Sequence, residues 1–167
     1  MITLITIGKI KEKYITDGIE DYLKRLSKYT KIELIELEDE SFDKTKTLKK
    51  EAEKILKRLN KKSYIITLEI EGKELSSIEL SNLIDNTLNN YSDITFVIGG
   101  SYGLDDSIKE LSNYKLSFSK MTFPHQLFRL LFLEQLYRSF KILNNEQYHK
   151  WQKNTWCSFY FIFYYRR

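Results

Sequence analysis

The residues best suited to chemistry gather at the start of one long apolar stretch. Pro124 and His125 open the segment PHQLFRLLFLEQLYRSF, which also carries Arg129 and, further along, Glu134 and Arg138. In a helix, His125 and Arg129 share one face and would offer a proton acceptor beside a positive charge. A buried, hydrogen-bonded histidine is an equally good interpretation of His125. The spacing of Glu134 and Arg138 by itself predicts an i, i+4 ion pair on the opposite face.

A glycine-rich loop is the second candidate. The run Gly99-Gly100-Ser101-Tyr102-Gly103 follows a buried apolar segment. Glycine lets the backbone approach a ligand and adopt positive φ, so the amides of this loop could face an adenosine or a phosphate. The run matches neither the dinucleotide-binding glycine pattern nor the P-loop pattern. A plain turn therefore stays open as the alternative.

The stretches around these residues alternate between strand-like and helix-like patterns. Apolar and β-branched runs predict strands at 2–8, 31–38, 63–70, 93–100 and 114–119. Helical apolar spacing predicts helices at 15–29, 48–59, 76–89, 106–111 and 124–140. This alternation predicts one α/β domain with a mainly parallel sheet. Because ligands bind outside the carboxyl ends of such strands, we expect the loops 69–76, 99–105 and 119–124 to form the site. The cation of Arg129 is expected to point into this crevice.

Composition narrows the class of protein. The chain has 167 residues, 42% of them hydrophobic and 30% charged, which is typical of one globular domain. A single cysteine and two histidines give no disulfide framework and few metal ligands, so no metal is expected. The first ten residues alternate like a strand and lack the basic start of a signal peptide. No apolar run reaches the roughly 20 residues of a membrane span. We expect a cytoplasmic protein that does not enter a membrane.

Charge is unevenly distributed along the chain. The net charge is only +4. Residues 33–43 contain six acids and no base, whereas residues 44–62 contain nine bases against two acids, Glu51 and Glu53. A basic helix face can contact phosphates. A solvated helix whose lysines reflect genome composition is the alternative interpretation.

Several motifs carry a family resemblance over residues 1–150. In order along the chain they are ITIGKIKEKY, ITLEIEGKELSS, FVIGGSYGL, LSFSKMTFPHQ, LEQLYRSFKI and EQYHK. They resemble the SPOUT-class RNA methyltransferases. The similarity is close to the ribosomal RNA large subunit methyltransferase H branch, which methylates N3 of a pseudouridine in 23S ribosomal RNA.

The resemblance implies a single-domain parallel-sheet α/β fold with a C-terminal trefoil knot, and a homodimer. Knots are nearly absent from protein folds, so the sequence patterns alone do not predict one. The resemblance also implies that S-adenosylmethionine is held by the knot loops. Matching positions assign the cofactor contacts to Leu68, Gly99, Phe118, Ser119, Lys120, Met121, Thr122 and Phe123.

The resemblance further implies the chemistry and its residues. N3 of a pyrimidine must lose a proton before or during attack on the sulfonium methyl group, and a desolvated cationic pocket favours the developing anion. Arg129 and His149 match catalytic positions, and Arg138, Tyr148 and Lys150 match RNA-binding positions. Residues 148–150 are expected to reach a neighbouring subunit. The expected partner is 23S rRNA, within an assembled ribosome.

One segment departs from the family pattern. Residues 1–150 form the expected methyltransferase domain, and the chain then continues with WQKNTWCSFYFIFYYRR, of which eight residues are aromatic. Stacking on bases is one interpretation of this extension, and translation past the usual end is the other. Two other functions stay open for the chain as a whole. One is another nucleotide-dependent α/β enzyme, and the other is a non-catalytic RNA-binding module that uses the basic helix.

Overall fold

Five parallel strands form one sheet in the computed structural model, which describes residues 1–148. Along the sheet the strands lie in the order β2-β1-β4-β3-β5. Their bounds are β1 (Ile2–Ile7), β2 (Ile32–Leu37), β3 (Tyr64–Glu74), β4 (Ile94–Ile98) and β5 (Tyr114–Ser117). Because every pairing is parallel, the carboxyl ends of all five strands lie at the same edge of the sheet.

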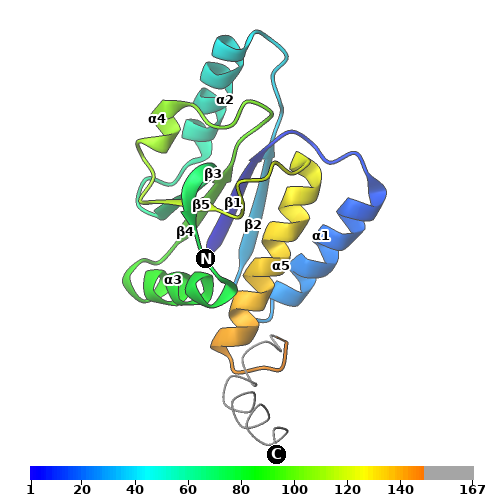
Figure 1. Ribbon diagram of the computed structural model, residues 1–167, viewed down its shortest axis with the longest axis vertical. Coiled ribbons are helices and arrows are strands. Elements are labelled where there is room, and N and C mark those ends of the chain that lie inside the picture. The colour runs from blue at the N-terminus through cyan, green and yellow to red at the C-terminus, as the bar shows by residue number, and fades with distance from the viewer. Residues whose placement is uncertain (149–167) are drawn as a thin grey trace, which may run out of the picture.

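Helices cover both faces of this sheet (Figure 1). Their bounds are α1 (Lys13–Leu26), α2 (Lys44–Arg58), α3 (Ser77–Asn90), α4 (Asp106–Lys109) and α5 (His125–Leu143). One apolar core lies between the sheet and α1, α3 and α5, and a second lies between the sheet and α2. The predicted α/β domain with a parallel sheet is confirmed.

Strand β4 lies at the centre of the sheet, and this position explains why its side chains are apolar on both faces of the sheet. All five of its residues are buried. The ring of Phe96 packs on the ring of Phe132 in α5, with centroids 4.8 Å apart, while Val97 faces the second core under α2. A parallel strand covered on both faces requires a continuous apolar run rather than an alternating one.

The predicted elements are correct in type and order, and the differences are at their ends. Helix α2 begins at Lys44, four residues before the prediction, because Asp43 caps it by accepting a hydrogen bond from the amide of Lys46 (3.1 Å). Helix α3 begins with a full capping box, in which Ser76 and Glu79 each bind the other's backbone amide. Local capping thus fixes both helix starts.

Helix α5 lies between α1 and α3 and rests on the sheet (Figure 1). Its inner side carries the buried residues Phe132, Leu133 and Leu136. Its outer side is less well covered, since Leu131 remains 36% exposed in the single chain. Within the described part of the chain, no helix is long and apolar enough to cross a membrane.

Strand β3 is longer than predicted because it leaves the sheet and returns to it. Leu68 and Lys73 both pair with Leu116 of β5, so the four residues between them are not in the ladder. Gly72 passes so close to β5 that a Cβ atom there would lie 2.6 Å from the backbone carbon of Leu116. Only glycine allows this approach of two backbones.

We expect Gly72→Ala to destabilise the fold, because the added methyl group collides with backbone atoms that cannot rotate away. Overpacking of this kind costs about 1–3 kcal/mol, and urea unfolding measures it. Lys73→Ala, at the exposed neighbouring position, is the matched control and is expected to change the free energy of unfolding by less than about 0.5 kcal/mol. Equal stability of the two variants would contradict the close approach.

Candidate functional site

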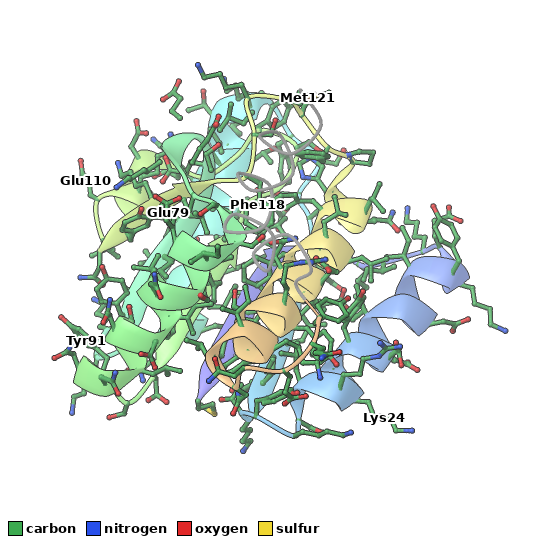
Figure 2. The ribbon with its side chains drawn as sticks, turned by 60° about the horizontal axis from the view of Figure 1, so that its bottom comes forward. Lys24, Glu79, Tyr91, Glu110, Phe118 and Met121 are labelled. Atoms are coloured by element: carbon green, nitrogen blue, oxygen red, sulfur yellow. The ribbon has the colours of Figure 1, made fainter. Side chains whose placement is uncertain are left out.

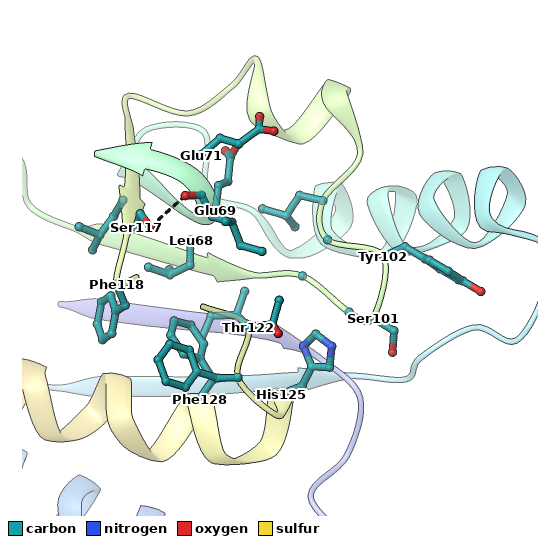
Figure 3. Close-up of a pocket in the computed structure, with 18 of the residues that line it drawn as sticks. Leu68, Glu69, Glu71, Ser101, Tyr102, Ser117, Phe118, Thr122, His125 and Phe128 are labelled. Atoms are coloured by element: carbon teal, nitrogen blue, oxygen red, sulfur yellow. Dashed lines mark hydrogen bonds between the residues drawn. The ribbon is translucent and has the colours of Figure 1, made fainter. Parts of the chain in front are cut away.

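The carboxyl ends of the strands surround a pocket of about 580 Å³ (Figure 3). Its walls come from residues 68–71 within β3, from 98–104 at the end of β4 and after it, and from 116–119 and 121–123 at the end of β5 and after it. Lys44, Lys109, His125 and Phe128 complete the lining. The prediction that the three strand-end loops meet at one site is confirmed.

Most of the residues matched to cofactor contacts line this pocket. Lys120 does not, and the other seven do: Leu68, Gly99, Phe118, Ser119, Met121, Thr122 and Phe123. Phe118 lies near the middle of the molecule, whereas Met121 is at its edge with 71% of its surface exposed (Figure 2). The structure thus brings seven of the eight residues together around one cavity, and their role in cofactor binding stays a prediction.

Gly99 serves the loop's own packing. A Cβ atom at this position would lie 2.3 Å from the carbonyl oxygen of Gly103 and 2.5 Å from its carbonyl carbon. Gly103 in turn has a positive φ of 82°, and its amide donates a hydrogen bond to the carbonyl of Gly100 (3.0 Å). The glycines therefore fold the loop back on itself, as in the plain turn that the sequence left open, and their approach to a ligand stays a prediction.

Aromatic rings form the apolar wall of the pocket. Phe128 of α5 contacts two of them: Phe118 edge to face at 5.1 Å and Phe123 in a stacked arrangement at 5.9 Å between centroids. Leu68 lies opposite this group across the cavity (Figure 3). Flat apolar walls of this kind suit a planar heterocycle.

Charged side chains enter the pocket from the other side, and none of them was singled out as a site residue from the sequence. Glu69 and Glu71 come from the segment of β3 that leaves the sheet, and the hydroxyl of Thr67 donates a hydrogen bond to Glu69 (2.6 Å). Lys109 belongs to α4, where a hydrogen bond to Asp106 raises its pKa and the charges of Glu69 and Glu71 raise it further. The pocket therefore offers both carboxylates and an ammonium group near its apolar wall.

His125 lies at the rim of the pocket beside Thr122 (Figure 3). Partial desolvation of the imidazole lowers its pKa, and the nearby charge of Arg129 lowers it further. The ring is consequently neutral at pH 7, where it can accept a hydrogen bond or a proton.

Arg129 is buried, with only 1% of its surface exposed, and it does not line the pocket. Its guanidinium donates hydrogen bonds to the carboxylate of Glu36 (2.8 Å) and to the carbonyl of Ile7. These partners lie near the carboxyl ends of β2 and β1, so Arg129 ties α5 to two strands. The expectation that this cation points into the crevice is wrong, because a buried guanidinium needs a carboxylate and Glu36 supplies one.

Arg138 and Tyr148 lie nearer the other end of α5. The predicted ion pair between Arg138 and Glu134 is confirmed. The guanidinium of Arg138 also lies over the ring of Tyr148 at 4.8 Å, and the Tyr148 hydroxyl donates to Glu134 (3.2 Å). Desolvation and the nearby carboxylate of Glu134 raise the pKa of Tyr148.

This cluster does not line the pocket. Arg138 lies thirteen residues beyond His125, which is about 20 Å along a helix. Within residues 1–148, the single chain therefore does not bring all the predicted site residues together. His149, Lys150 and the extension 151–167 lie outside the described residues.

Comparison with known proteins places the chain in a family. The family model described as "Predicted SPOUT methyltransferase" matches residues 1–149. The putative ribosomal RNA large subunit methyltransferase H of Methanococcus maripaludis is 56% identical over 157 residues, covering 89% of this chain and 99% of the relative. Ribosomal RNA large subunit methyltransferase H of Clostridium acetobutylicum is 51% identical with the same coverage of both chains.

Solved structures share the fold at low sequence identity. A probable methylase family protein from Haemophilus influenzae matches with a TM-score of 0.53 and 16% identity, covering 98% of this chain and 76% of that chain. The tRNA (m1G37) methyltransferase of Aquifex aeolicus matches with a TM-score of 0.51 and 13% identity, covering 82% and 69%. Because the family match spans all of the described residues, this protein is an enzyme of the SPOUT methyltransferase family.

Proposed function

We propose that this protein transfers a methyl group from S-adenosylmethionine to N3 of a pseudouridine in 23S ribosomal RNA, within an assembled ribosome. The observation that carries the proposal is the pocket at the strand ends, lined by seven of the eight residues at positions matching the family's cofactor contacts. Close relatives over nearly the whole chain bear the name of a ribosomal RNA methyltransferase, which supports the same substrate.

The pocket fits the proposed cofactor in size and in chemistry. Its volume of about 580 Å³ lies within the usual range for small-molecule sites. The Phe118 and Phe128 rings offer a wall for the adenine, while Glu69 and Glu71 can accept hydrogen bonds from ribose hydroxyls or an ammonium group. When bound, the cofactor supplies an electrophilic methyl group on a sulfonium.

The acceptor must lose a proton from N3 to become a nucleophile. His125 presents a neutral ring at the rim of the pocket, where it can accept a proton or a hydrogen bond from the incoming base. Phe118, Phe123 and Phe128 exclude water from the inner wall, which strengthens electrostatic interactions with the developing anion.

The other matched residues take separate roles in this proposal. Arg129 acts as a positioning residue, because it holds the start of α5 and therefore His125 against the ends of β1 and β2. His149 is assigned to catalysis, and Arg138, Tyr148 and Lys150 are assigned to RNA binding. Residues 1–150 form the methyltransferase domain, and residues 151–167 are an addition to it.

We also propose that the chain forms a homodimer through α5 and carries a trefoil knot around β5. The partly exposed outer side of α5 supports the dimer, since exposed leucines on a helix favour an interface. A second copy would bring the Arg138–Tyr148 cluster near the pocket of its partner, which one chain alone does not. The close passage of Gly72 against the backbone of β5 supports a tightly threaded chain.

The function is tested by incubating the protein with labelled S-adenosylmethionine and large ribosomal subunits from cells that lack this gene. We expect label in 23S rRNA, and mass spectrometry of the digested RNA should identify an N3-methylated pseudouridine. In parallel, calorimetry measures the binding of S-adenosylmethionine, NAD and ATP. RNA binding without methyl transfer would favour a non-catalytic module, and binding of NAD or ATP alone would favour another nucleotide-dependent enzyme.

The dimer is tested by Leu131→Glu, which places a charge on the outer side of α5. We expect light scattering to give twice the 20.1 kDa chain mass for the unaltered protein and the single mass for the variant, because burial of an unpaired carboxylate is costly. Leu111→Glu is the matched control, since that leucine is 37% exposed and lies just after α4. A monomeric unaltered protein at micromolar concentration would reject the proposal.

The positioning role predicts that Arg129→Ala lowers the free energy of unfolding by on the order of 2 kcal/mol, because it removes the hydrogen bonds that the buried guanidinium donates to the carbonyl of Ile7 and to the partly exposed Glu36. Glu36→Gln weakens the same pair. The free energy of unfolding lost in the double variant should therefore be smaller than the sum of the losses in the two single variants. Arg25→Ala, which breaks an exposed pair with Asp21, is the control and should have little effect. Additive losses in the double variant would show that Arg129 acts through other partners.

A further inference from the structure

The exposed side of helix α2 carries a concentration of positive charge that the pocket does not use. Lys46, Lys49, Lys50 and Lys57 are exposed and fall within about 100° of one another around the helix axis. We call these four residues the α2 basic face. The buried positions of the helix, among them Thr47, Glu51 and Ile55, lie on its other side. The face has one acid within it, the exposed Glu53.

Three of these four charges have no carboxylate partner among the described residues. Among residues 1–148, Lys49, Lys50 and Lys57 form no salt bridge, and the pair of Lys46 with Asp43 is long at 3.8 Å. Lys54 differs from them, because it binds Glu40 (2.6 Å) and the carbonyl of Glu38 (2.8 Å) and is half-buried. One lysine of α2 thus stabilises the fold, while the lysines of the face remain available to an anion.

The helix that carries the basic face begins at the pocket. Lys44, the first residue of α2, lines the cavity. The charge of Lys49 contributes to lowering the pKa of Asp105, after the hydrogen bonds from Ser107, which places this lysine near the end of the 99–105 loop. From Lys46 to Lys57 the face extends about 16 Å. One strand of a nucleic-acid duplex carries about four or five phosphates over that length.

An aromatic ring lies at the end of the face nearest the pocket. Phe42, just before α2, is 47% exposed, and the ammonium group of Lys50 lies 4.0 Å from its ring centroid. Tyr102 of the glycine loop is 49% exposed and directs its ring outward from the pocket (Figure 3). Exposed rings among lysines are the usual elements of a surface that binds single-stranded nucleic acid.

The concentration of positive charge on α2 has no counterpart on α1 or α3. Helix α3 has no basic residue, and α1 has acids among its bases. Helix α2 also covers the opposite face of the sheet from α5, so a dimer formed through α5 leaves the basic face open (Figure 1).

We propose that the α2 basic face, with Phe42, binds the phosphate backbone of the RNA that flanks the target base. The face directs that strand toward the pocket, where Lys44 is the last contact before the cavity. This inference rests on the proposed function, since it assigns the path of the same substrate.

The test is a triple variant, Lys49→Gln, Lys50→Gln and Lys57→Gln, which removes three charges that form no salt bridge among residues 1–148. The control is Lys13→Gln, Lys24→Gln and Lys28→Gln, which removes the same charge from exposed positions in and just after α1. Fluorescence anisotropy with labelled 23S rRNA fragments, measured over a range of salt, reports binding. Methyl transfer to large ribosomal subunits and calorimetry with S-adenosylmethionine are measured in parallel.

We expect the α2 triple variant to bind RNA at least about tenfold more weakly at 0.1 M salt, with the slope of log K against log salt reduced by about two to three. Its KM for ribosomal subunits should rise while its affinity for S-adenosylmethionine stays unchanged. Glu53→Gln should act in the opposite direction and strengthen RNA binding. Phe42→Leu should weaken binding with no change in the salt slope.

Equal RNA affinity and equal salt slope in the α2 triple variant and the α1 control would overturn the inference while leaving methylation by the unaltered protein intact. If the unaltered protein binds RNA but does not methylate it, the proposed function fails and the salt slopes still decide whether α2 is the binding face. Absence of both RNA binding and methylation in the unaltered protein would overturn both proposals.

Discussion

The five strands all run in the same direction, and the arrangement of the site follows from that constraint. Parallel strands bring their carboxyl ends to one edge, so segments as distant as residues 68 and 123 reach a common pocket. Parallel pairing also requires each connection to cross the sheet, which places helices on both faces. The buried Arg129 then fixes the last helix to this edge through Glu36 and the carbonyl of Ile7.

The two helical layers differ in the side chains that they expose to solvent. The layer of α1, α3 and α5 has the larger core and a partly exposed leucine on the outside of α5, which suits association with a second copy. Within residues 1–148, the layer of α2 has exposed lysines on its outside that form no salt bridge, which suits a polyanion. The pocket lies between these surfaces and receives side chains from both layers, namely Lys44 and Lys109 on one side and His125 and Phe128 on the other.

Local patterns in the sequence predict much of the fold. Strand runs such as 94–98 are apolar throughout because they are buried on both faces, and Ser76 with Glu79 marks a helix start by its own hydrogen bonds. The meeting of three loops follows from the parallel sheet alone. Contacts between distant segments could not be predicted in this way, since no local pattern encodes the pairing of Arg129 with Glu36 or the entry of Lys109 into the pocket. The bend of β3 after Leu68 was likewise absent from the pattern, because it depends on the backbone of β5.

That bend has a consequence for how the sequence can vary. Residues 69–72 leave the ladder, of which 69–71 line the pocket, and the chain returns at Gly72, where the backbone of Leu116 leaves no room for a side chain. The same four residues therefore have to form a wall of the pocket and bring the chain back to the ladder with β5. A change that improves one requirement disturbs the other, so mutational tolerance here should be narrower than the surface position of Glu71 suggests. Variation in substrate or cofactor preference is then easier to acquire in the loops after β4 and β5 than in this segment.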